Sequence, residues 1–219
     1  MENKYENKEL CAKCGGICCK KGGCQYSPTD FESLKFEYLY EQLQAGYISI
    51  VCVVDFVNLK GKLIANPMLY VKSRNEGRPI IDLLSMRTKC SALTDTGCMY
   101  DFKNRPSGGK NLIPGGTPDK CYPEIHPLEF IKMWQPQQQV LRKLVKRING
   151  RTVEAQLEID TYNLFKDVLA RKFDGIAPEE IENILGMLPM LSQVYSEATK
   201  KAIKEYRVLH PNDPILPKR

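Results

Sequence analysis

The chain has 219 residues, of which 42% are apolar, so it can bury a sizeable core as one domain or two small ones. Its 32 lysines and arginines against 26 acids give a net charge of +6, well short of the dense basic stripe that marks many nucleic-acid-binding proteins. The first ten residues, MENKYENKEL, lack the apolar core of a secretory signal, and no apolar run approaches the length of a membrane span. We therefore expect a globular cytoplasmic protein with no membrane association.

The cysteine content favours metal ligation over disulfides. The chain has nine cysteines, an odd number, and the cytoplasm keeps thiols reduced. Five of the nine lie in the stretch CAKCGGICCKKGGC, residues 11–24. Its lysines, Lys13, Lys20 and Lys21, would offset the negative charge of thiolates and lower the thiol pKa values.

The spacing within this stretch predicts part of a metal site. A turn between Cys11 and Cys14 would let both sulfurs face one ion, and the glycines that follow would let backbone amides approach the thiolates. Adjacent side chains tend to diverge, so Cys18 and Cys19 are expected to face different partners or different metals. The stretch therefore predicts one or two metal centres.

A helix and two strands are predicted after the cysteine stretch. Ser27, Thr29 or Asp30 can cap a helix over FESLKFEYLYEQLQA that ends at Gly46. The following segment YISIVCVVDFV is rich in β-branched residues and indicates a buried strand, in which Cys52 belongs to the core. A second strand is expected over residues 68–72.

The middle of the chain carries three more cysteines. The sequence KCSALTDTGC, residues 89–98, predicts a tight hairpin that would bring Cys90 close to Cys98. A Pro/Gly-rich segment, residues 105–127, follows with no steady period and contains Cys121. We expect a long ordered loop, since loops of this length in compact domains are usually functional or held by something such as a metal.

Long amphipathic patterns predict three helices in the C-terminal part of the chain, over residues 129–148, 153–172 and 178–206. Pro136 should either kink the first helix or begin its main body, because proline removes a backbone donor. His126, just before this helix, is expected to have a surface or capping role rather than to bind metal.

The stretch RKLVKRINGR places four basic side chains on one arc of the first of these helices: Arg142, Lys143, Lys146 and Arg147. A solvated face is the favoured interpretation, and an acidic partner such as nucleic acid is the alternative.

Eight cysteines form the predicted metal site: Cys11, Cys14, Cys18, Cys19, Cys24, Cys90, Cys98 and Cys121. A tetrahedral all-sulfur site suits zinc, and four thiolates can equally hold an iron–sulfur cluster, so the ligand type leaves both open. The linear spacing is not that of a ferredoxin.

The N-terminal cysteines resemble a known family. They reproduce the CxxCxxxCC signature of the YkgJ-type cysteine-cluster proteins, which are described as zinc- or iron-chelating. In that family two later cysteines and an Arg-Pro pair complete the pattern, and these correspond here to Cys90, Cys98 and Arg105-Pro106. Many members carry a further cysteine just after the Arg-Pro pair, where this chain has Ser107-Gly108-Gly109, and Cys121 is the expected replacement.

The resemblance covers residues 11–125 and implies metal binding without naming an activity. Flagellin lysine-N-methylase, a larger protein, carries a similar cluster, which raises protein modification or redox chemistry as an expectation. No S-adenosylmethionine motif is readable in this chain.

These patterns predict an α+β protein with a small cysteine-rich, metal-bound N-terminal region containing a few strands, followed by a C-terminal helical bundle. The expected division is a cysteine-cluster domain over residues 1–125 and a helical region over 126–219. The predicted function is cytoplasmic metal binding, with zinc or an iron–sulfur cluster as the cofactor and a protein partner as an option. The alternatives are a cluster-dependent enzyme, redox or protein-modifying, and a zinc-stabilised module that binds nucleic acid or protein.

Overall fold

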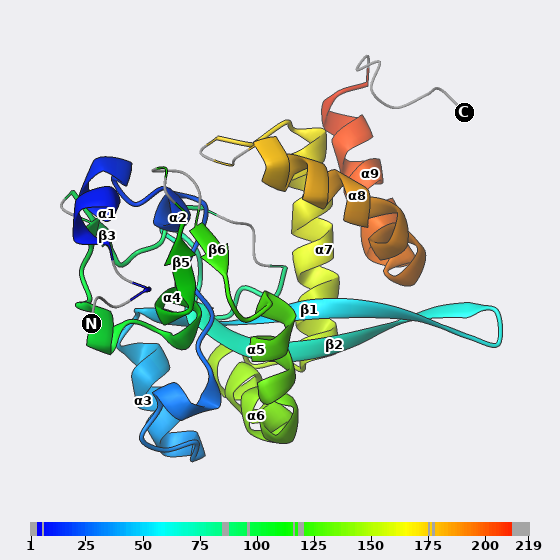
Figure 1. Ribbon diagram of the computed structural model, residues 1–219. Coiled ribbons are helices and arrows are strands. Elements are labelled where there is room, and N and C mark those ends of the chain that lie inside the picture. The colour runs from blue at the N-terminus through cyan, green and yellow to red at the C-terminus, as the bar shows by residue number, and fades with distance from the viewer. Residues whose placement is uncertain are drawn as a thin grey trace.

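The computed structural model describes residues 4–5, 7–84, 88–95, 97–115, 117, 121–174, 176 and 178–211, without the side chains of residues 8, 11, 12 and 179. Within these residues the protein is α+β, as predicted: helices surround three two-stranded antiparallel sheets, and the C-terminal part is helical. In Figure 1 the cysteine-rich segments lie at the left and the last helices at the right, both above the long β-hairpin.

The largest sheet is a hairpin of two twelve-residue strands, β1 (Ile48–Leu59) and β2 (Lys62–Ser73). They pair from Ile48 with Ser73 to Leu59 with Lys62. Both predicted strands are confirmed, but they continue further than expected and meet at a turn over Lys60 and Gly61, which have positive φ angles of 52° and 82°. The end near residues 48 and 73 is buried, whereas the turn end projects from the body of the molecule (Figure 1).

The cysteine stretch and its continuation form short helices: α1 (Lys8–Cys14), α2 (Ile17–Lys20), a 3-10 turn (Pro28–Asp30) and α3 (Phe36–Gln44). The predicted helix from residue 31 therefore begins later than expected. Phe31 is extended instead, because its ring packs between Tyr26 and Trp134. The predicted end at Gly46 is confirmed by the φ angle of 86° at this residue.

The middle of the chain contains small elements. The predicted hairpin is present as β3 (Leu93–Thr94) paired with β4 (Gly97–Cys98). The segment expected to be one long loop instead contains α4 (Ser107–Lys110), β5 (Leu112–Pro114) and β6 (Cys121–Pro123), with β5 and β6 paired. These elements could not be predicted from the sequence, because each has only three or four residues and is too short to show an apolar period.

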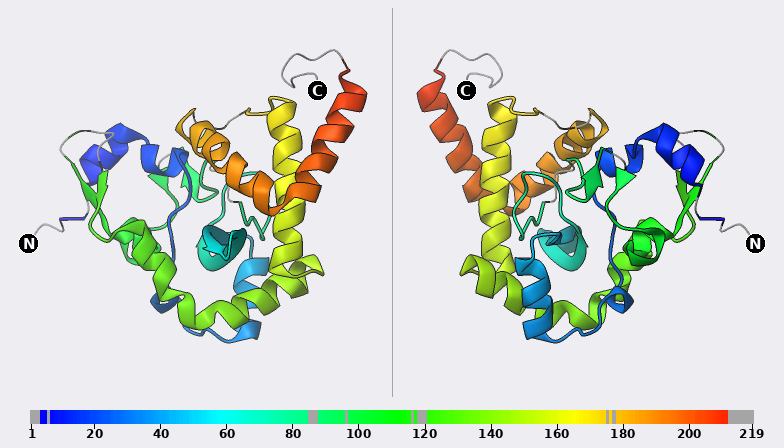
Figure 2. Two further views of the ribbon diagram at one scale, coloured as in Figure 1. Left: turned by 90° about the vertical axis from the view of Figure 1, so that its right-hand side faces the viewer. Right: turned by 90° about the vertical axis from the view of Figure 1, so that its left-hand side faces the viewer.

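The C-terminal part contains, in chain order, α5 (Pro127–Met133), a 3-10 turn (Gln135–Gln137), α6 (Gln138–Asn149), α7 (Val153–Leu169), α8 (Pro178–Val194) and α9 (Ser196–Leu209). Pro136 interrupts the first predicted helix, and the main body follows it. His126 caps α5, since its Nδ1 accepts a hydrogen bond from the Leu128 amide. The third predicted helix is wrong as a single helix, because the backbone breaks at Tyr195 into α8 and α9. Helices α7 and α9 lie side by side (Figure 2).

The main core lies where the buried end of the β1–β2 hairpin meets α3, α6 and α7. Trp134 is fully buried there, and its indole N–H donates to the Tyr26 carbonyl at 2.8 Å. A smaller core joins α7, α8 and α9. The main core contains residues from both sides of position 125, such as Leu69 and Leu144, and the expected division into two domains stays a prediction.

Most of the basic arc on α6 is exposed to solvent. Lys143, Lys146 and Arg147 are exposed, while Arg142 donates to Glu154 at 2.5 Å. Among the described residues, none of the helices is long and apolar enough to cross a bilayer.

Candidate functional site

Seven of the eight cysteines predicted as ligands line a single cavity of about 100 Å³: Cys14, Cys18, Cys19, Cys24, Cys90, Cys98 and Cys121. They come from α1, α2, the segment before the first 3-10 turn, the β3–β4 hairpin and β6. The eighth, Cys11, lies in α1, and its side chain is outside the described part of the structure. Cys52 is buried in β1 and does not line this cavity, which confirms its prediction as a core residue.

The local structure of the CxxC pair differs from the prediction. Cys11 and Cys14 both lie in α1, and the turn follows them at Gly15 and Gly16, whose φ angles of 59° and 73° are left-handed. This turn reverses the chain into α2 and lets the Ile17 amide donate to the Cys14 sulfur at 3.4 Å. The glycines thus place two short helices at one cavity wall.

Backbone hydrogen bonds attach the cysteine stretch to distant parts of the chain. The Cys90 amide donates to the Cys19 carbonyl at 2.7 Å, and the Ser73 amide donates to the Cys24 carbonyl at 2.8 Å. Asn75 accepts a hydrogen bond from the Gly23 amide through its side-chain oxygen at 2.9 Å. The end of β2 and the segment before β3 therefore determine where the N-terminal sulfurs lie.

Two glycines allow the backbones to approach this closely. A Cβ at Gly23 would lie 2.2 Å from the Ser73 carbonyl oxygen, and a Cβ at Gly108 would lie 2.9 Å from the Gln25 amide nitrogen. The strand-like segment around Cys24 is thus held between β2 and α4. Next along α4, a Cβ at Gly109 would lie 3.4 Å from the Cys24 sulfur.

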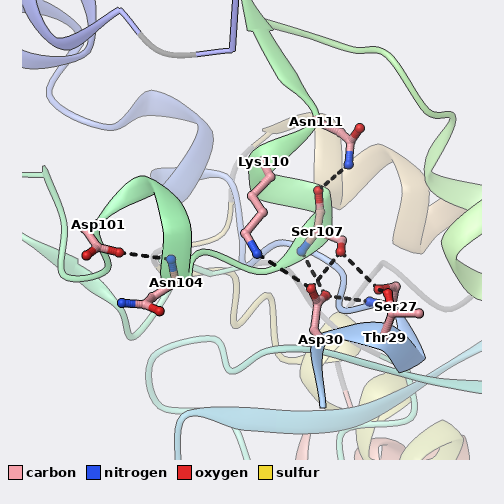
Figure 3. A network of polar contacts seen from close by, with 8 residues as sticks. All are labelled: Ser27, Thr29, Asp30, Asp101, Asn104, Ser107, Lys110 and Asn111. Atoms are coloured by element: carbon pink, nitrogen blue, oxygen red, sulfur yellow. Dashed lines mark hydrogen bonds and ion pairs between the residues drawn. The ribbon is translucent and has the colours of Figure 1, made fainter. Parts of the chain in front are cut away.

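A buried carboxylate anchors α4 at the cavity (Figure 3). Asp30 accepts hydrogen bonds from the Ser107 amide at 2.9 Å and from its hydroxyl at 2.7 Å. The same carboxylate accepts from the Ser27 amide at 2.8 Å, and the Lys110 ammonium lies 4.0 Å away. The network joins the start of the first 3-10 turn to the residues that follow Arg105-Pro106.

Three of the thiols are in direct contact. Hydrogen bonding with the Cys19 thiol lowers the pKa of Cys18 to about 6 and the pKa of Cys90 to about 7. The same contacts, together with burial, raise the pKa of Cys19. The Cys19 thiol thus interacts with both the Cys18 and the Cys90 thiols. The expectation that Cys18 and Cys19 diverge is therefore wrong, since the single turn of α2 presents both to one cavity.

Negative charge accumulates at the cavity wall. Burial, followed by the charges of Cys18, Cys90 and Cys98, raises the pKa of Cys24 to about 12. Two cations favour the thiolate forms instead. Lys72 lowers the pKa of both Cys24 and Cys90, and Arg105 lowers the pKa of Cys18.

The sequence had pointed to Lys13, Lys20 and Lys21 as the neutralising cations, and it gave no local signal for Lys72. Lys72 lies in β2, far along the chain from the cysteine stretch, and the hairpin fold alone brings it there. Arg105 had been noted only as part of the Arg-Pro pattern. It lines the cavity, and its guanidinium lies 5.8 Å from the centre of the Phe102 ring.

The described wall of the cavity contains no imidazole or carboxylate, and its donor groups are the seven thiols together with the hydroxyls of Tyr5, Ser73 and Tyr100. In the part of the chain that the structure describes, no group of three or more Cys, His, Asp or Glu side chains is arranged so that it could hold a metal ion. The cysteines thus share a cavity without a formed coordination shell, and metal ligation by the eight cysteines stays a prediction.

Comparisons of the chain with family models, with curated proteins and with solved structures found no match.

Proposed function

We propose that the protein binds zinc or an iron–sulfur cluster through the cysteines of the cavity, as a cytoplasmic metal-binding protein. The observation that carries the proposal is the gathering of seven thiols, from segments between residues 14 and 121, around one small cavity. Sulfur donors suit zinc and iron–sulfur clusters, whereas harder ions such as Mg²⁺ and Ca²⁺ take oxygen ligands.

The charge balance of the cavity supports this proposal. Contact with Cys19 lowers the pKa of Cys18 and of Cys90, while burial and neighbouring negative charge raise the pKa of Cys24. A bound cation favours the thiolate form of every ligand and would remove this opposition. Arg105 and Lys72 would stabilise the remaining negative charge.

The volume of the cavity limits which kind of metal centre fits into it. About 100 Å³ is several times the roughly 30 Å³ that one water occupies in the liquid, so the cavity has room for more than a single ion. The cavity is therefore large enough for an iron–sulfur cluster, for a pair of ions, or for one zinc ion with solvent.

The family resemblance is part of the proposal, and one contact strengthens it. Many members of the YkgJ-type family carry a cysteine just after Arg-Pro, where this chain has Ser107-Gly108-Gly109. Cys24 lies 3.4 Å from where a Cβ at Gly109 would be, so its sulfur occupies the space beside that position. We infer that Cys24, rather than Cys121, replaces the missing cysteine, and that Cys121 is an additional thiol at the cavity.

Metal binding of this kind would also hold the cysteine-bearing segments together. Helices α1 and α2, the β3–β4 hairpin and β6 each contribute at least one sulfur, and each has few residues. The free energy of metal binding would then contribute directly to folding.

The decisive experiment is purification without oxygen, followed by the visible spectrum and by zinc, iron and sulfide analysis of the same sample. Brown protein with iron and sulfide would identify a cluster, and colourless protein with zinc would identify a zinc site. Cys14→Ser and Cys90→Ser should lose most of the metal. Cys52→Ser is the matched control, because Cys52 is buried away from the cavity and should keep the metal. Wild-type protein without stoichiometric metal, or full retention in both cavity variants, would contradict the proposal.

A further inference from the structure

The outer half of the β1–β2 hairpin forms an arm of two strands, residues 54–59 and 62–67, joined by the turn at Lys60 and Gly61. Both turn residues have positive φ angles, as in the hairpin turns that match the twist of paired strands. The Asn58 side chain also accepts a hydrogen bond from the Gly61 amide at 2.9 Å. The arm is therefore a well-defined surface, and it projects from the body of the molecule (Figure 1).

The register of the two strands assigns the side chains of the arm to two faces. Residues directly opposite each other in an antiparallel pair lie on the same face, and successive residues along a strand alternate between faces. One face, which we call the open face, carries three pairs: Asp55 with Asn66, Val57 with Ile64, and Leu59 with Lys62. The other face carries Phe56, which packs against the smaller core of α7, α8 and α9. The hairpin thus uses one face for its own fold.

The open face has an exposed apolar centre. The exposed fractions of Val57, Leu59 and Ile64 are 37%, 55% and 39%, and the three residues occupy neighbouring pair positions. Single apolar side chains are common on protein surfaces, but a group of neighbours is typical of contact with another molecule. A two-stranded hairpin is also marginally stable by itself in water, so cover on this face would stabilise the arm.

Charges of opposite sign lie at the two ends of the open face. Asp55 is two residues before Val57 on β1, and Lys62 is two residues before Ile64 on β2. Because the strands are antiparallel, the two charges lie on opposite sides of the central pair along the arm. Both side chains are exposed, and within the described part of the chain neither forms an ion pair.

This order of groups is complementary to itself. When two open faces pack together with the arms pointing in opposite directions, Asp55 of each copy lies at the end that carries Lys62 of the other. When the arms point in the same direction, Asp55 lies near Asp55 and Lys62 near Lys62, so like charges repel. A twofold axis beside the central pair generates the first arrangement, and twofold symmetry is the commonest symmetry of protein dimers.

We propose that the open face binds the open face of a second copy of this chain, as an antiparallel twofold dimer. Val57 and Ile64 of both copies form its centre, and an Asp55–Lys62 ion pair forms at each end. The patch involves few residues, and interfaces of small area belong to weak, transient complexes, so we expect a dissociation constant on the order of 10 µM. The cysteine cavity takes no part, and the proposal is independent of metal binding.

The test is sedimentation velocity of the purified full-length protein from about 1 µM to about 500 µM, a range that brackets the expected dissociation constant. The wild-type protein should pass from monomer to dimer in this range. Asp55→Lys and Lys62→Asp should each weaken self-association at least tenfold, because each places like charges at both ends of the dimer. Ile64→Asp should do the same by placing a charge at the centre.

The matched control is Lys35→Asp, which makes the same change of charge as Lys62→Asp. Lys35 is exposed at the start of α3, on the opposite side of the molecule from the arm (Figure 1). This variant should associate as the wild type does. Circular dichroism of each variant checks that the fold is retained, which is expected because all the substituted side chains are exposed.

Mixing the two charge variants tests the antiparallel arrangement. Asp55→Lys has positive charge at both ends of the open face, and Lys62→Asp has negative charge at both ends. The mixture should therefore associate at least tenfold more tightly than either variant alone, whereas a mixture of Asp55→Lys with Lys35→Asp should not. The double variant Asp55→Lys/Lys62→Asp should regain self-association, because it restores opposite charges.

Two outcomes would overturn the proposal. Wild-type protein that stays monomeric up to about 500 µM would exclude a second copy as the occupant and leave the open face to a different protein. Self-association that survives both charge variants and Ile64→Asp would place the dimer interface elsewhere on the molecule.

Discussion

The cysteine-bearing segments and the C-terminal helices are stabilised in different ways. Helices α6 and α7 bury Leu141, Leu144, Val145 and Leu157 almost completely in the main core. By contrast, between residues 88 and 125 the buried apolar side chains among the described residues are Cys90, Ala92, Leu93 and Pro106. Apolar burial drives folding, so the cysteine-bearing segments have little driving force of their own and depend on hydrogen bonds and, by our proposal, on metal.

Metal removal should have the largest effect and should separate the two regions. Stripping the metal with a chelator should lower the protection against hydrogen exchange at the described residues of 88–123 by about 3 kcal/mol or more, because the metal then no longer links these segments. Exchange in α6 and α7 should change little. Mass spectrometry of exchange measures both at once, and equal loosening of both regions would contradict this contrast.

A core truncation should show the opposite pattern. Leu144→Ala removes a fully buried side chain from α6 and should lower the free energy of unfolding by about 3 kcal/mol. Chemical denaturation measures this change. Metal content per folded molecule should stay at the wild-type value, and a loss of metal in this variant would show that the two regions are more tightly coupled than we propose.

A glycine substitution should act on the contact between α4 and the cysteine stretch. Gly108→Ala places a Cβ 2.9 Å from the backbone of Gln25, which should cost about 2 kcal/mol and reduce the metal content. Gly186→Ala is the control, since it lies in α8 with nothing within 4 Å of the added Cβ. The control should be neutral or stabilise the protein by about 0.5 kcal/mol, because alanine favours the helix.

The smallest effect is expected from a substitution of Asp160, a carboxyl group that does not line the cysteine cavity. Burial raises the pKa of Asp160 on α7 to about 6, and one of its oxygens lacks a hydrogen-bond partner among the described residues. Because the folded-state pKa is raised, Asp160 destabilises the fold as pH rises through about 6, when the buried group ionises.

Asp160→Asn should therefore raise the free energy of unfolding by about 1 kcal/mol at pH 8 and by little at pH 4. Thermal unfolding at the two pH values measures this. A gain that is the same at both values would show that ionisation is not the cause.

The predictability of the fold depended on the length of its elements. The strands around Cys52 and residues 68–72 and the helix over residues 153–169 were predicted, since each repeats its apolar period several times. The helix start at residue 31 and the single helix over residues 178–206 were wrong. In both cases a tertiary contact prevailed over local preference: Phe31 packs on Trp134, and the chain turns at Tyr195 so that α9 can lie against α7.

The candidate site was predictable to a similar extent. Cysteine has few roles at this density, so number and spacing selected the eight cysteines, and seven of them line one cavity. The contacts of Lys72, Asp30 and Gly109 carried no local signal. They lie far along the chain from the residues they contact. Pairing of β2 and α4 with residues 24–26, and the hydrogen bonds of Ser107 to Asp30, bring them there.

The amino-acid sequence by itself determined the donor chemistry and the long elements, because thiol ligation and apolar periodicity are properties of residue type and spacing. The tertiary structure alone decided which thiols touch and which cations neutralise them. Such juxtapositions arise from hydrogen bonds and packing between segments separated by many residues, and no local pattern encodes them.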